Sequence, residues 1–188
     1  MIFREVEDRD LIAKARRGNV EAYNHLVSRW EKRIFNYLYR LVKDREDAMD
    51  LSQDVFLKAH QNLKKLEDAD RFAPWLFRIA HNEAYSLLRK NRPETDLEDH
   101  VEGESWGATA IGRRMLPIEV SLAVQSALER LSEEQREAVV LKIYQGFKFE
   151  EMADILSCPV STIKSRLYTA LENLKGTLAP LQVRGIEE

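Results

Sequence analysis

The stretch "GFKFEEMADILSCPVSTIKSRLYTALENLK", Gly146 to Lys175, decides the fold class of the C-terminal part of the chain. A short amphipathic pattern reaches a turn at Ser157-Cys158-Pro159, and a longer helical pattern follows it. Two helices joined by so short a turn are typical of a helix-turn-helix. At 3.6 residues per turn, the second helix gathers an apolar stripe on one side. The stripe consists of Ile163, Leu167, Ala170, Leu171 and Leu174.

The opposite side of this second helix is rich in small hydroxyl groups and carries an arginine. Short side chains permit close approach to the major groove of DNA, and an Arg can fork onto a guanine edge or bind a phosphate. A solvated outer face on a small helical bundle would have the same pattern, so periodicity alone leaves both interpretations open. The candidate DNA-contacting residues are Ser161, Thr162, Lys164, Ser165, Arg166 and Thr169.

Helical periodicity also dominates the rest of the chain, with no strand-like alternation. We expect helices at about 7–18, 21–42, 45–65, 73–91, 118–130, 133–145, 149–157 and 160–176. The segment 92–117 breaks this pattern, since it is rich in acidic residues and Gly and is bounded by Pro. The sequence therefore predicts an all-α fold of two small helical domains, residues 1–92 and 118–188, joined by a flexible linker, residues 93–117.

Composition narrows the class of protein. The 188 residues carry a net charge of −3, divided as +4 over residues 1–93, −5 over 94–119 and −2 over 120–188. An acidic total argues against a protein that coats nucleic acid by charge alone. The single Cys excludes an internal disulfide, and no Cys and His spacing suits zinc. The chain has no apolar run typical of a signal peptide or membrane span, so we expect a cytoplasmic protein without membrane insertion.

A second candidate surface lies in "PWLFRIAHNEAYSLLRKNR", Pro74 to Arg92. One side of this helix combines aromatic and basic residues with no carboxylate: Trp75, Arg78, His81, Asn82, Tyr85, Ser86, Arg89 and Arg92. Bases of single-stranded nucleic acid stack on aromatic rings, while guanidinium groups bind phosphates. The alternative is that Trp75 and Tyr85 only fill gaps between helices. The absence of acid favours nucleic-acid binding.

The stretch "DREDAMDLSQDVF", Asp44 to Phe56, places Asp47, Asp50 and Asp54 on one narrow stripe. A divalent ion would need converging ligands from another segment, and acid–base catalysis would need a pocket with two distinct environments. The sequence supplies neither, so we predict no metal site, no catalytic residue and no cofactor. A solvated face remains possible, but the neighbouring Gln53, Phe56 and Leu57 favour a protein-docking surface.

These motifs, in this order, resemble the bacterial RNA polymerase sigma factors of the extracytoplasmic-function type, which belong to the sigma-70 family. "DREDAMDLSQDVFLKAHQNL" is similar to the family's core-binding helix, and "FAPWLFRIAHNEAYSLLRKNR" to its promoter-melting segment. Residues 128–175 resemble the domain that reads the minus-thirty-five element. The resemblance covers nearly the whole chain outside the linker and the extreme C-terminus.

The resemblance assigns roles to particular positions. It implies that core polymerase is bound by Asp47, Asp50, Gln53, Asp54 and Phe56. It places a loop that captures a flipped minus-ten base at Leu66 to Phe72, and melted-DNA contacts at Trp75, Arg78 and Asn82. The expected minus-ten set is Leu66, Asp70, Arg71, Phe72, Trp75, Arg78, Asn82, Tyr85, Ser86 and Arg89. Ser86, Ser161 and Thr169 depart from the residues that the family often has, so no promoter sequence can be transferred.

We therefore expect a promoter-specificity subunit, not an enzyme. Its partners would be core RNA polymerase, promoter DNA as duplex and melted strand, and, as the resemblance implies, an anti-sigma factor. Two other classes remain. A stand-alone helix-turn-helix regulator would bind duplex DNA without polymerase, but it would have no use for the acidic stripe or the face at Trp75. A DNA-processing enzyme would need a nucleophile or a metal-binding cluster.

Overall fold

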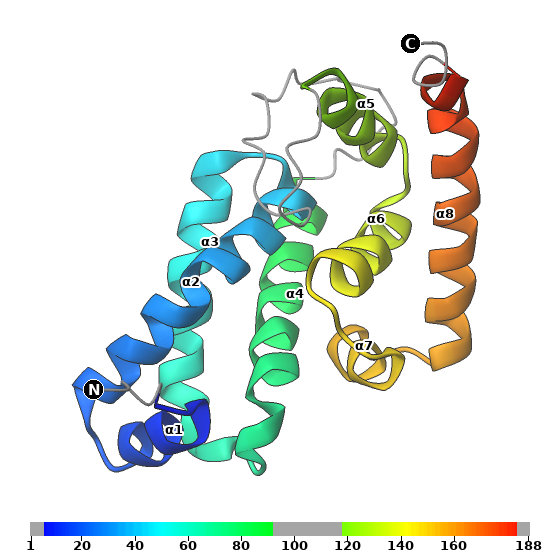
Figure 1. Cartoon of the computed structure of the whole chain (residues 1–188). Coiled ribbons are helices and arrows are strands. Elements are labelled where there is room, and N and C mark those ends of the chain that lie inside the picture. The colour runs from blue at the N-terminus through cyan, green and yellow to red at the C-terminus, as the bar shows by residue number, and fades with distance from the viewer. Residues whose placement is uncertain (1–5, 92–117, 184–188) are drawn as a thin grey trace, which may run out of the picture. The chain divides into compact units, whose positions relative to one another are not determined.

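The computed structural model describes residues 6–91 and 118–183, and every regular element in these ranges is a helix (Figure 1). The described residues fall into two compact units, one built from α1–α4 and the other from α5–α8. The all-α prediction with two helical parts is thereby confirmed. The predicted linker, residues 93–117, lies outside the described residues, so its boundaries stay a prediction. No described helix is both long and apolar enough to cross a lipid bilayer.

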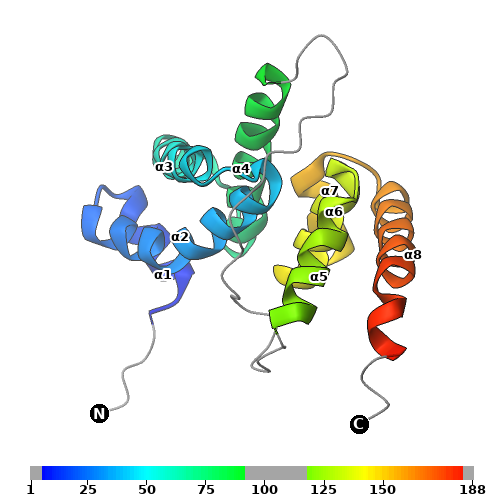
Figure 2. The same cartoon turned by 90° about the horizontal axis from the view of Figure 1, so that it is seen from above.

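The N-terminal unit consists of α1 (Asp8–Arg16), α2 (Val20–Val42), α3 (Arg45–Asn62) and α4 (Phe72–Lys90). Two short 3₁₀ turns, η1 (Leu63–Lys65) and η2 (Ala69–Arg71), connect α3 to α4. The long helix α2 packs against α1, α3 and α4, and α3 also packs against α4, beside which it is seen nearly end-on in Figure 2. The expected helix boundaries are correct to within a few residues.

Local sequence explains where α2 and α3 begin. The side chain of Asn19 accepts a hydrogen bond from the Ala22 amide (2.8 Å), and that of Asp44 accepts one from the Asp47 amide (2.8 Å). Such caps satisfy amide groups that have no partner inside the helix. Each helix then turns an apolar face to a shared core, whose fully buried members include Ile12, Leu26, Ile34, Tyr37, Leu38, Leu76 and Phe77. Burying one such aliphatic or Phe side chain contributes about 1.5–3 kcal/mol.

The C-terminal unit consists of α5 (Ile118–Glu129), α6 (Glu133–Val139), a π-helical turn η3 (Val140–Tyr144), α7 (Phe149–Leu156) and α8 (Val160–Val183). A capping box at Ser132 and Gln135 starts α6. The buried guanidinium of Arg136 donates to the carbonyls of Leu128 (3.2 Å) and Leu131 (3.1 Å), which satisfies the C-terminal end of α5. The helix α8 packs against α5 and α6.

Two sequence expectations are wrong in this unit. The sequence assigns Leu171 to the apolar stripe of the second helix of the helix-turn-helix, but its side chain is 39% exposed. Ile163, Leu167 and Ala170 of the same stripe are buried. The physical reason is that the apolar stripe is broader than the surface that α5 and α6 cover. The last helix also runs to Val183, seven residues past its expected end at 176, although it passes Gly176 and Pro180, two residue types that disfavour a helix interior.

Candidate polymerase and nucleic-acid interfaces

The acidic stripe, defined as Asp47, Asp50 and Asp54, lies with Gln53 on the outer side of α3. Asp50, Gln53 and Asp54 are exposed, and Asp47 is half-buried. Two large apolar side chains accompany them, Met49 (46% exposed) and Leu57 (57% exposed). Ala48, Leu51, Val55 and Ala59 on the inner side are buried, as the periodicity predicts. The arrangement combines carboxylates with apolar anchors, as protein interfaces do.

Helix capping accounts for only part of this acidity. Asp44 caps α3, and acids in its first turn such as Asp47 are stabilised by the helix dipole. Asp50 and Asp54 lie beyond the first turn, where the dipole contributes little. Within residues 6–91 and 118–183, neither carboxylate makes an ion pair, and Lys58, one turn after Asp54, pairs instead with Glu83 on α4 (Nζ to Oε2, 2.5 Å). Their acidity thus has no internal structural role in the described residues.

Phe56 departs from the predicted interface. The sequence counts it among the apolar anchors of a docking surface, but its side chain is only 8% exposed because it lies on the inner side of α3. Its carbonyl accepts a hydrogen bond from the Tyr23 hydroxyl of α2. The neighbouring Leu57 is exposed instead, so the apolar part of the surface consists of Met49 and Leu57.

The aromatic and basic face of α4 is open where the sequence predicts it. Arg78, Asn82 and Arg89 are exposed, while Trp75, Tyr85 and Ser86 are half-buried. Glu83 is the only carboxylate of this helix, and its ion pair with Lys58 turns it toward α3. The face therefore carries only neutral and basic groups. This arrangement can attract phosphates and present rings for stacking.

Intramolecular contacts support the rings of this face. Trp75 packs against Phe72 with ring centroids 5.9 Å apart, and the His81 and Tyr85 rings are 4.5 Å apart. The Arg89 side chain folds back to the Tyr85 carbonyl (3.3 Å). Trp75 and Tyr85 thus pack against neighbouring rings and also keep some accessible surface, so the two interpretations of these aromatics are compatible.

The predicted base-capturing loop, Leu66 to Phe72, is built on buried ends. Leu66 is 5% exposed and Phe72 is 2% exposed, so these two residues anchor the loop and do not present their side chains for contact. Asp68 caps the η2 turn by accepting from the Asp70 amide (2.9 Å). Asp70 and Arg71 are exposed, and Asp70 pairs with Arg9 of α1 at 3.5 Å. The loop is therefore held at both ends and polar at its tip.

The helix-turn-helix also has the predicted geometry. Ser157 adopts a left-handed conformation (φ 51°) that ends α7, and the Pro159 carbonyl accepts from the amides of Thr162 (3.0 Å) and Ile163 (3.2 Å) to start α8. On α8, Ser161, Lys164, Ser165 and Thr169 are exposed, whereas Thr162 and Arg166 are half-buried. All six predicted residues therefore have accessible surface on one helix.

Sequence reasoning missed Tyr168, which is 58% exposed on the same side of α8. The signal was available, because position 168 is two helical turns after Ser161. It also missed the surroundings of Phe149 at the start of α7, where the ammonium groups of Lys142 and Lys164 lie 4.7 and 5.3 Å from the ring centroid. Those contacts join three segments of the unit, so no local pattern predicts them.

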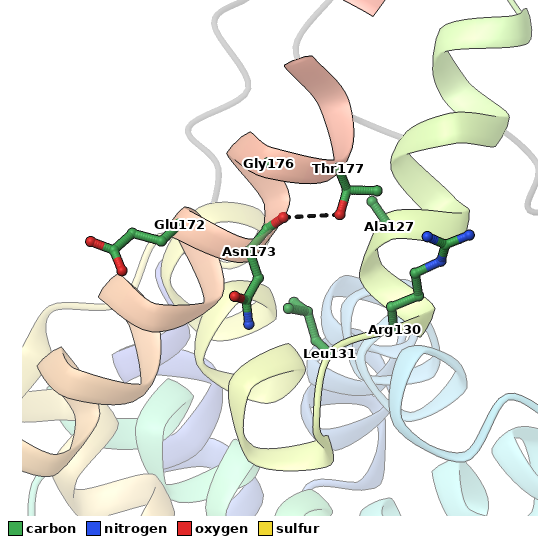
Figure 3. Close-up of a pocket in the computed structure, with 7 residues that line it drawn as sticks. All are labelled: Ala127, Arg130, Leu131, Glu172, Asn173, Gly176 and Thr177. Carbon is green, nitrogen blue, oxygen red and sulfur yellow. Dashed lines mark hydrogen bonds between the residues drawn. The ribbon is translucent and has the colours of Figure 1, made fainter. Parts of the chain in front are cut away.

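An open groove of about 440 Å³ lies between α5 and α8 (Figure 3). It is lined by Ala127, Arg130, Leu131, Glu172, Asn173, Gly176 and Thr177. None of the predicted site residues lines it, so it is separate from the candidate DNA-contacting residues of α8. Across the described ranges, no group of three or more His, Cys, Asp or Glu residues is placed to hold a metal ion.

Comparison with known proteins adds an independent line of evidence. Residues 26–94 match the family model described as Sigma-70 region 2, and residues 121–174 match Sigma-70, region 4. The RNA polymerase sigma-H factor of Pseudomonas aeruginosa is 30% identical over 184 residues, which cover 93% of this chain and 95% of that protein. The ECF RNA polymerase sigma-E factor of Escherichia coli K12 is 30% identical over 186 residues, covering 94% and 97%.

Two solved structures are also similar over most of their length. CnrH, in complex with the cytosolic domain of CnrY, has a TM-score of 0.68 and 29% identity, covering 92% of this chain and 97% of that one. RpoE of Bartonella quintana, in complex with the anti-sigma factor NepR, has a TM-score of 0.65 and 27% identity, covering 84% and 96%. With both sigma-70 regions in order and relatives that match along almost its full length, the chain belongs to the extracytoplasmic-function sigma factors of the sigma-70 family.

Proposed function

We propose that this protein binds core RNA polymerase and directs promoter-specific transcription initiation. In this proposal the N-terminal unit docks on polymerase and handles the minus-ten element, and the C-terminal unit reads the minus-thirty-five element. The corresponding domains are residues 1–92 and 118–188, with residues 93–117 as the linker. The role is that of a binding subunit in the cytoplasm, where core polymerase acts, and involves no chemistry by the chain itself.

One observation carries the proposal beyond family membership. The N-terminal unit has two chemically opposite surfaces on adjacent helices, the acidic stripe with Met49 and Leu57 on α3 and the carboxylate-free aromatic face on α4. A regulator that binds only duplex DNA has no use for either surface. A polymerase subunit that handles melted DNA uses both, since one surface attracts a protein partner and the other attracts bases and phosphates.

Docking and melting are coupled in this scheme. Taking a base out of the stack costs a few kcal/mol, so contacts of polymerase elsewhere must offset that cost. The isolated protein should bind duplex DNA weakly, because its net charge of −3 is unfavourable and its contacts are few. Specificity should then emerge in the holoenzyme, where both promoter elements are held at once.

The direct test is transcription from a randomised promoter library with purified core polymerase, with and without the full-length protein. The proposal expects selected transcripts whose templates share two spaced elements, appearing only when the protein is present. Failure to bind core or to select any template would contradict it. Tight and specific binding to duplex DNA in the absence of polymerase would instead support a stand-alone regulator.

We also propose that an anti-sigma factor controls the protein. Two structurally similar sigma factors are known in complexes, RpoE with the anti-sigma factor NepR and CnrH with the cytosolic domain of CnrY. A partner of this kind would compete with core polymerase for the acidic stripe. Expressing the chain with candidate partners from its own genome should yield a complex that core polymerase displaces, and a complex that core does not disturb would argue against this mode of control.

A further inference from the structure

The helix α1 contacts the connection between α3 and α4, although α1 lies outside the segment that matches Sigma-70 region 2. In Figure 1 this connection passes beside α1 before α4 begins. The contact is polar and specific. Nε of Arg16, the last residue of α1, donates to the Leu63 carbonyl (3.2 Å), and its Nη2 donates to the Leu66 carbonyl.

The position of Arg16 suits the chemistry of a helix end. The helix α3 finishes at Asn62, and the Leu63 carbonyl that follows it accepts a backbone hydrogen bond from the Leu66 amide (3.4 Å), which leaves its second lone pair for Arg16. A cation is favourable here, because the C-terminal end of a helix carries partial negative charge. A guanidinium is planar and offers its donors in a fixed fork, so holding two carbonyls at once fixes their relative orientation.

The two carbonyls lie just before and at the first residue of the loop that the proposed function assigns to base capture. The side chains of Leu63 and Leu66 are 2% and 5% exposed, so the backbone is fixed from inside by packing and from α1 by Arg16. The exposed part of the loop, including Asp70 and Arg71, follows immediately. A second, exposed contact from α1, Arg9 to Asp70 at 3.5 Å, ends on the loop itself.

We infer that Arg16 is a positioning residue for minus-ten recognition. By holding the carbonyls of Leu63 and Leu66, it keeps the loop 66–72 in the one conformation that accepts an unstacked base. This inference rests on the proposed function. The physical reason is preorganisation, because a loop that must become ordered on binding loses conformational entropy at that moment and binds more weakly.

The test uses the full-length protein assembled with core polymerase. The probe is a fork-junction DNA carrying the minus-ten sequence that the wild-type protein selects from a randomised library. R16Q removes the fork, and R17Q is the matched control, since Arg17 is exposed and, in the part of the chain that the structure describes, its side chain makes no hydrogen bond or ion pair with the loop. R16K retains the charge but not the planar fork and should lie between R16Q and the wild type.

For R16Q we expect roughly tenfold weaker binding of the fork junction, which corresponds to the ordering cost of about one backbone residue. Discrimination at the base read by the loop should fall, whereas core binding and preference at the minus-thirty-five element should stay as in wild type. Amide exchange of residues 64–71 should also quicken in the free protein. R17Q should behave as wild type in every assay.

Three results would overturn the inference. R16Q could bind the fork junction and discriminate at the base read by the loop as wild type does. It could also lose core binding and minus-thirty-five preference to the same extent as fork-junction binding, which would reveal a general structural role. If R16Q does not fold, R16K takes its place in the test. Fork-junction affinity and base discrimination equal to wild type in R16K would then overturn the inference. A wild-type protein that selects no minus-ten sequence would refute the proposed function itself, which is a distinguishable outcome.

Discussion

At the scale of single residues, Asp50 and Asp54 are the sharpest test of the polymerase interface. Both are exposed and lie beyond the first turn of α3, so removing their charge should leave the fold unaffected. We expect D50N/D54N to bind core polymerase roughly ten- to a hundredfold more weakly, with a reduced salt dependence. Affinity for labelled core at two salt concentrations measures this.

The matched control for that pair is E21Q/E31Q, which removes two exposed charges from α2. It should bind core as the wild type does. An equal loss in both double variants would mean that total charge, and not the acidic stripe, governs docking. Unchanged core affinity in D50N/D54N would identify the stripe as a solvated surface.

Trp75 tests the melted-strand surface at the same scale. Stacking of one base on an aromatic ring is worth about 1–3 kcal/mol by alanine substitution, so W75A should weaken binding of a minus-ten single strand to holoenzyme by that amount. W75F should retain most of the affinity, since Phe also presents a flat ring. Thermal unfolding of both variants separates stacking from the loss of packing against Phe72. Equal affinity for W75A and wild type would exclude the ring as a stacking platform.

At the scale of elements, a buried hydroxyl joins α2 to α3. Tyr23 is 8% exposed and donates to the Phe56 carbonyl, and burial raises its pKa from 10.0 to about 12. A raised pKa favours the neutral hydroxyl in the folded state. This stabilisation is therefore complete below pH 10 and is lost as the pH rises through 12.

We expect the wild-type protein to lose about 2–3 kcal/mol of unfolding free energy between pH 10 and 12 that Y23F does not lose. Below pH 10, Y23F should be less stable by about 1 kcal/mol for the missing hydrogen bond. Urea unfolding across this pH range measures both effects. Y168F removes an exposed hydroxyl and serves as the control. Identical pH profiles for Y23F and wild type would contradict the coupling.

The reading helix α8 gives the second prediction at this scale. R166A should relax base preference at one position of the minus-thirty-five element by about 1–3 kcal/mol, whereas K164A should weaken binding uniformly and lower the salt slope by about one. R130A removes a like charge just after the end of α5 and should change neither. Selection of randomised minus-thirty-five sequences by holoenzyme distinguishes the two effects. A uniform loss in R166A would show that this Arg contacts a phosphate.

At the scale of the whole molecule, the proposed mechanism depends on two units binding one promoter together. The linker then sets the effective concentration of the second unit once the first is bound. Effective concentration falls roughly as the −3/2 power of linker length, so doubling segment 93–117 with Gly and Ser should lower affinity for a two-element promoter about threefold. Affinity for a promoter that keeps only the minus-ten element should not change. Equal losses on both promoters would mean that the insertion damages a unit directly.

The amino-acid sequence by itself determined the helical class, where each helix begins to within a few residues, and most of the exposed site residues. Those properties depend on periodicity and on local caps, such as Asn19 and Asp44, whose partners are only three residues away. The stripe of Asp50 and Asp54 was predictable for the same reason, since residues three and four apart share one face of a helix.

Only the tertiary structure decided which of these residues are exposed and which face the core. Phe56, Leu66 and Phe72 match the family's contact positions in sequence, yet their side chains are buried. The contacts from Arg16 to Leu63 and Leu66 join positions about fifty residues apart, and the ion pair from Lys58 to Glu83 joins two helices. No local pattern encodes such contacts, because they exist only once packing has brought separate helices together.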